Sequence, residues 1–225
     1  MTTALAIFVK TPGLSPIKTR LAAGIGAEAA LRFHYLAAAA TAETVSACSS
    51  ILTPYWAVAE DNPVTRDCWS GFPRLWQGTG TLGERLHRIH TALQSRHGSV
   101  LMIGADTPQL TPALLQQVVT TLHNPATAHI LGPAKDGGFW LFGSKQPIPL
   151  GTWKAVPYSR ADTAEALRNA LQDTGRLDAL PTLTDVDTAD DLPILIEALQ
   201  QLTNPLPAQL ELTTWLTSME MLSSH

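Results

Sequence analysis

The hydrophobic positions along the chain follow two different periods. Short apolar runs bounded by polar residues, glycine or proline are typical of strands that are buried on both faces. The clearest runs of this kind are 4–9, 55–59, 99–104 and 128–132, and weaker runs are 74–77, 139–142 and 177–183. Between them, apolar residues at helical spacing predict helices. The predicted helices cover 27–47, 82–96, 112–123, 160–173, 190–202 and 208–222.

The alternation of strands and helices predicts an α/β protein with a mostly parallel sheet between two helical layers. Ligands in such folds bind beyond the carboxyl ends of the strands. Clusters of polar and glycine residues follow the strands 4–9, 99–104 and 128–132. We therefore expect one domain over residues 1–203. A segment with two prolines follows it, and residues 204–225 are expected to form a C-terminal helical extension.

Composition narrows the class of protein. The 225 residues include 15 Lys and Arg against 19 Asp and Glu, a formal net charge of −4, which argues against a nucleic-acid partner. The two cysteines, Cys48 and Cys68, form no CxxC pair and no disulfide framework. No apolar run approaches the length of a membrane span, and the first residues lack the features of a secretory leader. We expect a cytoplasmic protein with reduced thiols.

The loop after the first strand is rich in cations. Lysine and arginine side chains can neutralise a polyphosphate while loop amides donate hydrogen bonds to it. The candidate nucleotide-binding residues are Lys10, Thr11, Gly13, Lys18 and Arg20, of which Lys18 and Arg20 are also candidate catalytic residues. The loop lacks the spacing of a Walker A or a dinucleotide-binding motif. The alternative is a solvated basic loop without a ligand.

Two aspartates are candidate metal ligands. Asp106 directly follows the strand 99–104, and Asp187 lies in the acidic segment near the end of the domain. Mg²⁺ is bound by one or two carboxylates together with phosphate oxygens, which suits such a pair. Asp106 is also a candidate catalytic residue, and its alternative role is to cap a turn. Asp185 and Asp187 would face the same side if this segment is extended. Thr188 is expected to cap the next helix.

Two glycine-containing segments are candidate binding loops. Asp136, Gly137 and Gly138 follow the strand 128–132, and paired glycines permit close approach of a ligand to the backbone. We expect these three residues to position the acceptor or donor, with Asp136 also a candidate catalytic residue. The alternative is a plain hairpin turn. The second segment precedes the helix 82–96, whose first amides could bind an anion. Its candidate nucleotide-binding residues are Gln77, Gly78, Gly80 and Gly83.

Other residues are expected to be structural. His87, His90 and His97 share one side of the helix 82–96, where a metal site is conceivable, but no cysteine or spaced carboxylate accompanies them. We expect a solvated helix face there. The six tryptophans are scattered along the chain and are expected to pack in the core.

The ordered set of motifs resembles known families. The first basic motif is similar to that of the phospholactate guanylyltransferases, and residues 105–108 (A-D-T-P) look like their metal-binding A-D-L-P. Residues 185–192 resemble the D-[IV]-D-T-P-x-D-L of many nucleotidyltransferases. A bacterial glycosyltransferase-like family, of the radical-SAM/selenodomain-associated transferase type, carries V-K-x-P…K-T-R-L, Q-G-x-G-x-L-G-x-R, G-x-D-x-P and G-P-x-x-D-G-G-[YF]. This chain has all four in that order over residues 4–200.

The resemblance implies a GT-A (nucleotide-diphospho-sugar transferase) fold, which is Rossmann-like with one reversed strand. It also implies a nucleotide donor with Mg²⁺ or Mn²⁺. The chain lacks the G-G-x-S-x-R-M-G of sugar-nucleotide synthases. At the end of the strand 99–104 it has Gly104-Ala105-Asp106 in place of the D-x-D of many GT-A glycosyltransferases, and Ala189 stands where many relatives have proline.

Three functions are therefore considered. The first is glycosyl transfer from a nucleotide-diphospho-sugar to a small-molecule acceptor. The second is nucleotidyl transfer from a nucleoside triphosphate to a phosphorylated or carboxylate acceptor, with release of pyrophosphate. The third is nucleotide binding without turnover, although a pure binder needs no pair of metal-binding carboxylates. The nucleobase, the sugar, the acceptor and the oligomeric state stay open, with a homodimer as one candidate.

Overall fold

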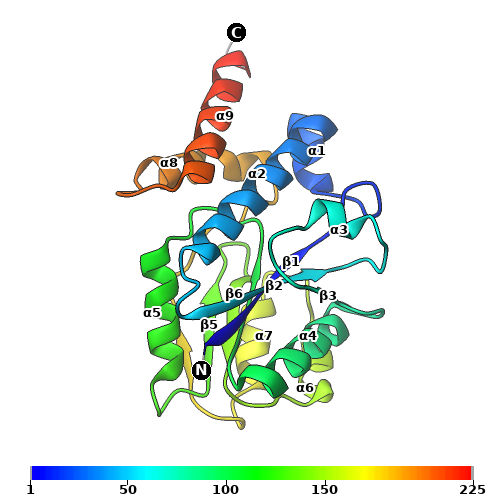
Figure 1. Cartoon of the computed structure of the whole chain (residues 1–225), viewed down its shortest axis with the longest axis vertical. Helices are drawn as coiled ribbons and strands as arrows, with labels where there is room; N and C mark the ends of the chain where they lie inside the picture. The colour runs from blue at the N-terminus through cyan, green and yellow to red at the C-terminus, as the bar shows by residue number, and fades with distance from the viewer. Residues whose placement is uncertain (1, 224–225) are drawn as a thin grey trace.

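The computed structural model describes residues 2–223, and the side chains of residues 2–219 (Figure 1). Within these residues, one seven-stranded sheet has the order β3-β2-β1-β4-β6-β5-β7. The strands are β1 (Thr3–Val9), β2 (Leu52–Val58), β3 (Arg74–Trp76), β4 (Val100–Gly104), β5 (His129–Pro133), β6 (Phe139–Ser144) and β7 (Leu177–Ala179). Only β6 runs antiparallel to its neighbours β4 and β5. The expected mostly parallel sheet with one reversed strand is confirmed.

The helices follow the predicted pattern, with three short additions. They are α1 (Thr19–Ile25), α2 (Ala27–Ser46), α3 (Thr65–Cys68), α4 (Leu82–His97), α5 (Pro112–His123), α6 (Leu150–Ala155), α7 (Thr163–Ala170), α8 (Leu192–Gln200) and α9 (Pro207–Ser223), with a 3₁₀ turn over Ala189–Asp191. The helices α1, α3 and α6 span only four to seven residues, too few to reveal a helical period. The helix predicted over 160–173 corresponds to α7, which is shorter. None of the helices in the described part of the chain has the length and apolar character needed to cross a bilayer.

The sheet has a core on each face. Alternate residues of β1 point to opposite faces. Leu5 and Ile7 belong to the core under α2 and α5, whereas Ala4 and Ala6 belong to the core under α4, α6 and α7. The aromatic side chain of Trp153 is fully buried in the same core. Each buried leucine or isoleucine contributes about 1.5–3 kcal/mol through its removal from water.

A third core lies beyond the sheet and is built from helices together with Val186 of the segment before α8. It joins Leu21 of α1 and Phe33 of α2 with Leu195 of α8 and Leu212 of α9. Figure 1 shows α8 and α9 at the upper end of the molecule, and α9 packs against α2. This packing anchors α1, so the basic loop before it is held between β1 and a helical layer. The division of the chain after residue 203 stays a prediction.

Threonine side chains cap the starts of α5 and of the 3₁₀ turn before α8. The Thr111 side chain accepts a hydrogen bond from the Leu114 amide at 3.1 Å and caps α5, which has proline in its first turn. Thr188 forms a reciprocal capping box with Asp191 before α8. These caps fix where the helices begin, and therefore where the preceding loops must end.

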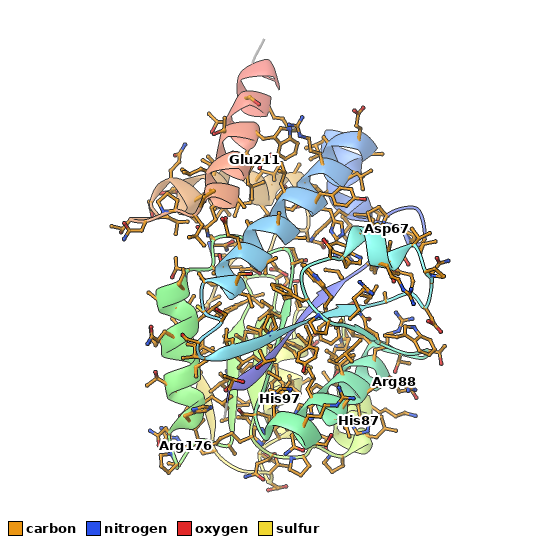
Figure 2. The ribbon with its side chains drawn as sticks, viewed as in Figure 1. Asp67, His87, Arg88, His97, Arg176 and Glu211 are labelled. Atoms are coloured by element: carbon orange, nitrogen blue, oxygen red, sulfur yellow. The ribbon has the colours of Figure 1, made fainter. Side chains whose placement is uncertain are left out.

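The histidines of α4 correct one expectation. His90 does not lie on a solvated face: it is fully buried and packs against Phe142 and Trp153. Burial lowers the pKa of His90 to about 4, so the ring is neutral. His87 and His97, labelled in Figure 2, are only partly buried. The difference arises because α4 packs one side against the sheet, and His90 falls on that side.

Candidate active site

The basic loop ends at Lys18, whose backbone and side chain are both unusual. Lys18 precedes α1 with φ 42° and ψ 48°, the left-handed region that side-chain-bearing residues seldom adopt. Its side chain is only 12% exposed, and Nζ donates hydrogen bonds to Asp106 Oδ2 at 2.7 Å and to the Val186 carbonyl. A strained backbone that places an ammonium group between two acceptors is characteristic of a functional position.

Asp106 lies just beyond the carboxyl end of β4 and is the partner of Lys18. Burial alone would raise the pKa of Asp106, but the charge of Lys18 and its hydrogen bond outweigh this and hold the pKa below its usual value. The side chain keeps 35% exposure. Asp106 is therefore ionised at neutral pH and still faces solvent on one side.

The acidic segment near the end of the domain reaches the same place. The Val186 amide donates to the Asp106 carbonyl at 3.2 Å, which aligns the segment with the end of β4. The neighbouring Asp187 accepts a 2.7 Å hydrogen bond from Arg20 Nη1 through Oδ2. The structure thus brings together two ion pairs whose members are far apart in the sequence. Lys18 and Asp106 are 88 positions apart, and Arg20 and Asp187 are 167 positions apart.

These residues border a cleft of about 450 Å³ at the carboxyl ends of β1 and β4. Its charged side chains are Lys10, Lys18, Arg20, Arg85, Asp106 and Asp187, an excess of two positive charges. His34 also borders the cleft, and burial lowers its pKa, so it adds no charge at neutral pH. A cationic cleft at this edge of the sheet suits a ligand with several phosphate charges.

The donor atoms in the cleft fit a divalent cation. Asp106 and Asp187 offer two carboxylates, and Mg²⁺ typically combines one or two carboxylates with phosphate oxygens and water. Among residues 2–223, no group of three or more histidine, cysteine, aspartate or glutamate side chains is arranged to hold a metal alone. A metal here would therefore depend on oxygen atoms from a ligand. The assignment of Asp106 and Asp187 as metal ligands stays a prediction.

Three candidate nucleotide-binding residues hold the shape of the loops. Gln77 borders the cleft, but its side-chain nitrogen donates to the carbonyls of Ala57 at 2.8 Å and Val9 at 3.4 Å. Thr11 is fully buried, and its hydroxyl accepts a hydrogen bond from the Trp69 ring. Gly13 is exposed in a turn with φ 82° and lies outside the cleft lining. Contacts of these residues with a nucleotide stay predictions.

The glycines before α4 and in its first turn also lie outside the cleft lining. Gly78 packs beside Arg88, Gly80 beside Glu84, and Gly83 beside the Trp153 carbonyl. Contact of these glycines with a nucleotide stays a prediction. The anion site predicted at the start of α4 already has internal partners: the Thr81 hydroxyl accepts from the Glu84 amide, and the Glu84 carboxylate accepts from the Thr81 amide.

Arg85 was not among the predicted site residues, yet it borders the cleft. Its Nε donates to the Gly80 carbonyl at 3.1 Å, which directs the guanidinium along the start of α4. In the sequence, Arg85 is the last residue of the Q-G-x-G-x-L-G-x-R motif, of which only the glutamine and the glycines were predicted to bind a nucleotide. Arg85 supplies the fourth cation of the cleft.

The segment between β5 and β6 is a hairpin turn and also borders a second cavity. The Ala134 amide donates to the Gly138 carbonyl at 2.9 Å, which closes the turn. Gly137 has φ 89°, and a Cβ there would lie 1.9 Å from the Ala161 carbonyl oxygen, so glycine is required. Gly138 has no such backbone requirement. Asp136 and Gly138 line the second cavity, of about 220 Å³.

Asp185 is a further residue of this second cavity. Burial, followed by the negative charges of Asp106 and Asp136, raises the pKa of Asp185 to about 7. Asp185 and Asp187 were expected to face the same side, but they line the second cavity and the cleft respectively. Phe8, Leu82 and Gly104 line both cavities, so the two cavities lie next to each other.

Comparison with known proteins places the chain in a family. The family profile described as an uncharacterized protein conserved in bacteria (DUF2064) matches residues 37–160, and the chain belongs to this family. This agrees with the bacterial family that the sequence motifs indicate. No curated protein matches the chain.

Solved structures share the fold. A candidate nucleotide-diphospho-sugar transferase from Desulfovibrio desulfuricans G20 has a TM-score of 0.84 and 22% identity over 97% of this chain and 96% of that chain. The 4-diphosphocytidyl-2C-methyl-D-erythritol synthase from Anaerococcus prevotii DSM 20548 has a TM-score of 0.59 and 14% identity over 89% and 96% of the two chains. A CMP:2-keto-3-deoxy-manno-octonic acid synthetase complexed with CTP has a TM-score of 0.54 and 13% identity over 90% of this chain and 100% of that chain. These similarities confirm the fold class.

Proposed function

We propose that this protein is a metal-dependent transferase that binds a nucleotide-activated donor in the cationic cleft, with glycosyl transfer from a nucleotide-diphospho-sugar as its reaction. The observation that carries the proposal is the composition of the cleft: four cationic side chains beside two carboxylates at the carboxyl edge of the sheet. A diphosphate needs cations to bind, and a divalent cation needs carboxylates.

The basic residues have the role of neutralising the phosphates. These residues border the cleft from three places: Lys10 and Lys18 from the loop after β1, Arg20 from α1 and Arg85 from α4. In the structure, Lys18 and Arg20 are paired with the two carboxylates. Bound phosphates would compete for these cations, and positive charge beside the departing oxygen stabilises the transition state.

Asp106 and Asp187 would hold Mg²⁺ or Mn²⁺ against the donor. A bound divalent cation would supply charge stabilisation for the leaving phosphate. The residues of the chain bind and orient the donor: Asp106 follows a rigid buried strand, and Asp187 is aligned with it through the Val186 amide. Asp136 and Gly138 border the neighbouring space, where we place the acceptor or the transferred group, and Gly137 forms the turn between them.

Nucleotidyl transfer is the second candidate. The segment after β4 contains the single aspartate Asp106 rather than a D-x-D pair, a feature more typical of nucleotidyltransferases. Two of the proteins with a similar fold are a cytidyl-group synthase and a synthetase solved with CTP. Both reactions break a bond to phosphate and need the same stabilisation of the leaving group. Nucleotide binding without turnover is the third candidate.

Product analysis separates these functions. Purified protein is first screened by thermal shift with nucleotides and nucleotide sugars, with and without Mg²⁺ or Mn²⁺, because a bound donor raises the melting midpoint. Mixtures of recognised donors and small-molecule acceptors are then assayed for nucleoside diphosphate and for pyrophosphate. Release of nucleoside diphosphate supports glycosyl transfer, and release of pyrophosphate supports nucleotidyl transfer. Binding without either product supports nucleotide binding without turnover. Absence of any nucleotide-dependent shift would contradict the proposal.

A matched pair of variants tests the location of the donor. Arg20→Gln removes a cleft cation whose side chain is 70% exposed, so the fold should tolerate the change. Arg96→Gln removes an exposed arginine at the far end of α4 and serves as the control. We expect donor affinity to fall about tenfold for Arg20→Gln alone, the size of one charge-assisted contact. Equal affinity in both variants would show that the basic loop is only a solvated connection.

A further inference from the structure

The second cavity differs in charge from the cleft beside it. Its lining contains two carboxylates, Asp136 and Asp185, and a single cationic residue, Arg160. Arg160 is already engaged, because its Nε and Nη2 donate to the two carboxylate oxygens of Asp162 at 3.0 and 3.1 Å. A phosphate group in this cavity would therefore meet negative charge without a free cation to offset it.

The walls of the cavity are largely apolar. Met102 and Ile103 of β4 and Trp140 of β6 form part of the lining, and Leu86 of α4 adds a further apolar side chain. A space of about 220 Å³ with such walls accommodates one small ring or a short chain. Apolar walls also exclude the water that would otherwise hydrate a strongly charged group.

We propose that the second cavity binds the acceptor and that this acceptor is a small molecule with an apolar part and no phosphate. This inference rests on the proposed function, in which the donor occupies the cleft, and it specifies the substrate class on the acceptor side. The shared lining residues Phe8, Leu82 and Gly104 place such a molecule next to the donor. A phosphorylated acceptor, as nucleotidyl transfer to a sugar phosphate would require, does not suit this cavity.

Two matched probes test the selectivity of the cavity. Benzyl alcohol and benzyl phosphate share the same ring and differ in the phosphate. Their binding to the full chain is measured by ligand-observed NMR, and benzyl phosphate is titrated against bound benzyl alcohol so that only competition at the shared site is counted. We expect benzyl alcohol to bind and benzyl phosphate to displace it with at least about tenfold weaker affinity.

A double variant ties the effect to named residues. The double variant Asp136→Asn with Asp185→Asn should bind benzyl phosphate about tenfold better than the parent while its affinity for benzyl alcohol stays unchanged.

Three results would overturn the inference: no binding of benzyl alcohol, displacement by benzyl phosphate at equal or tighter affinity, or equal benzyl phosphate affinity in the parent and the double variant. The nucleotide thermal-shift screen depends on the cleft and uses neither probe. Loss of the nucleotide response with the expected probe selectivity would contradict the proposed function alone. The opposite pattern would contradict the acceptor class alone.

Discussion

Replacing Asp185 with asparagine should stabilise the protein at pH 8 and have little effect at pH 4. The pKa of Asp185 is raised from 3.8 to about 7 because burial and the charges of Asp106 and Asp136 disfavour its ionised form. Between these two pKa values the folded state binds more protons than the unfolded state. Stability therefore falls as the pH rises through this range, and above pH 7 the full penalty is present. Asparagine has the same shape and no charge.

The shift sets the size of the effect. A difference of about 3 pKa units corresponds to about 4 kcal/mol at most, at 1.36 kcal/mol per unit. The side chain is partly exposed, so solvent screening reduces the expected gain to about 2 kcal/mol. The free energy of unfolding is measured by urea denaturation at both pH values in a buffer with a chelator, so that no divalent cation neutralises the site.

Asp190→Asn is the matched control, because Asp190 lies in the same segment and is exposed. It should change the unfolding free energy by less than about 0.5 kcal/mol at either pH. The reasoning is refuted if Asp185→Asn is equally stable to the parent at pH 8, or if its gain is the same at pH 4. A confirmed gain would mean that the site retains a carboxylate at a cost in stability, as functional sites commonly do.

Further predictions concern the cleft, the hairpin and the metal. Arg85→Gln should weaken donor binding about tenfold by thermal shift or calorimetry, whereas Arg96→Gln should not. Gly137→Ala should lower the unfolding free energy by more than about 2 kcal/mol, because its φ is 89° and a backbone carbonyl lies 1.9 Å from the added Cβ. Gly138→Ala should cost clearly less, and equal losses would contradict this account. Asp106→Asn should abolish metal-dependent turnover while circular dichroism stays unchanged; full activity would exclude Asp106 as a metal ligand.

Much of the architecture and the centre of the cleft could be predicted from local patterns. Runs of apolar residues such as 99–104 have few alternatives to a buried strand, because their side chains must leave water on both faces. Parallel strands carry their following loops to one edge of the sheet, so Lys18 and Asp106 could be expected at the same edge. The structure confirms that they meet, at 2.7 Å.

Tertiary packing decided the rest, because it determines which side of each segment is covered. His90 has the same local pattern as its neighbours on α4, but the sheet covers it. Asp185 and Asp187 are two residues apart, yet the approach of the Val186 amide to Asp106 directs one to the second cavity and the other to the cleft. The sequence by itself determined the strands, the caps and the charged groups available. Long-range contacts, whose energies no local pattern contains, decided which of those groups face each other across the two cavities.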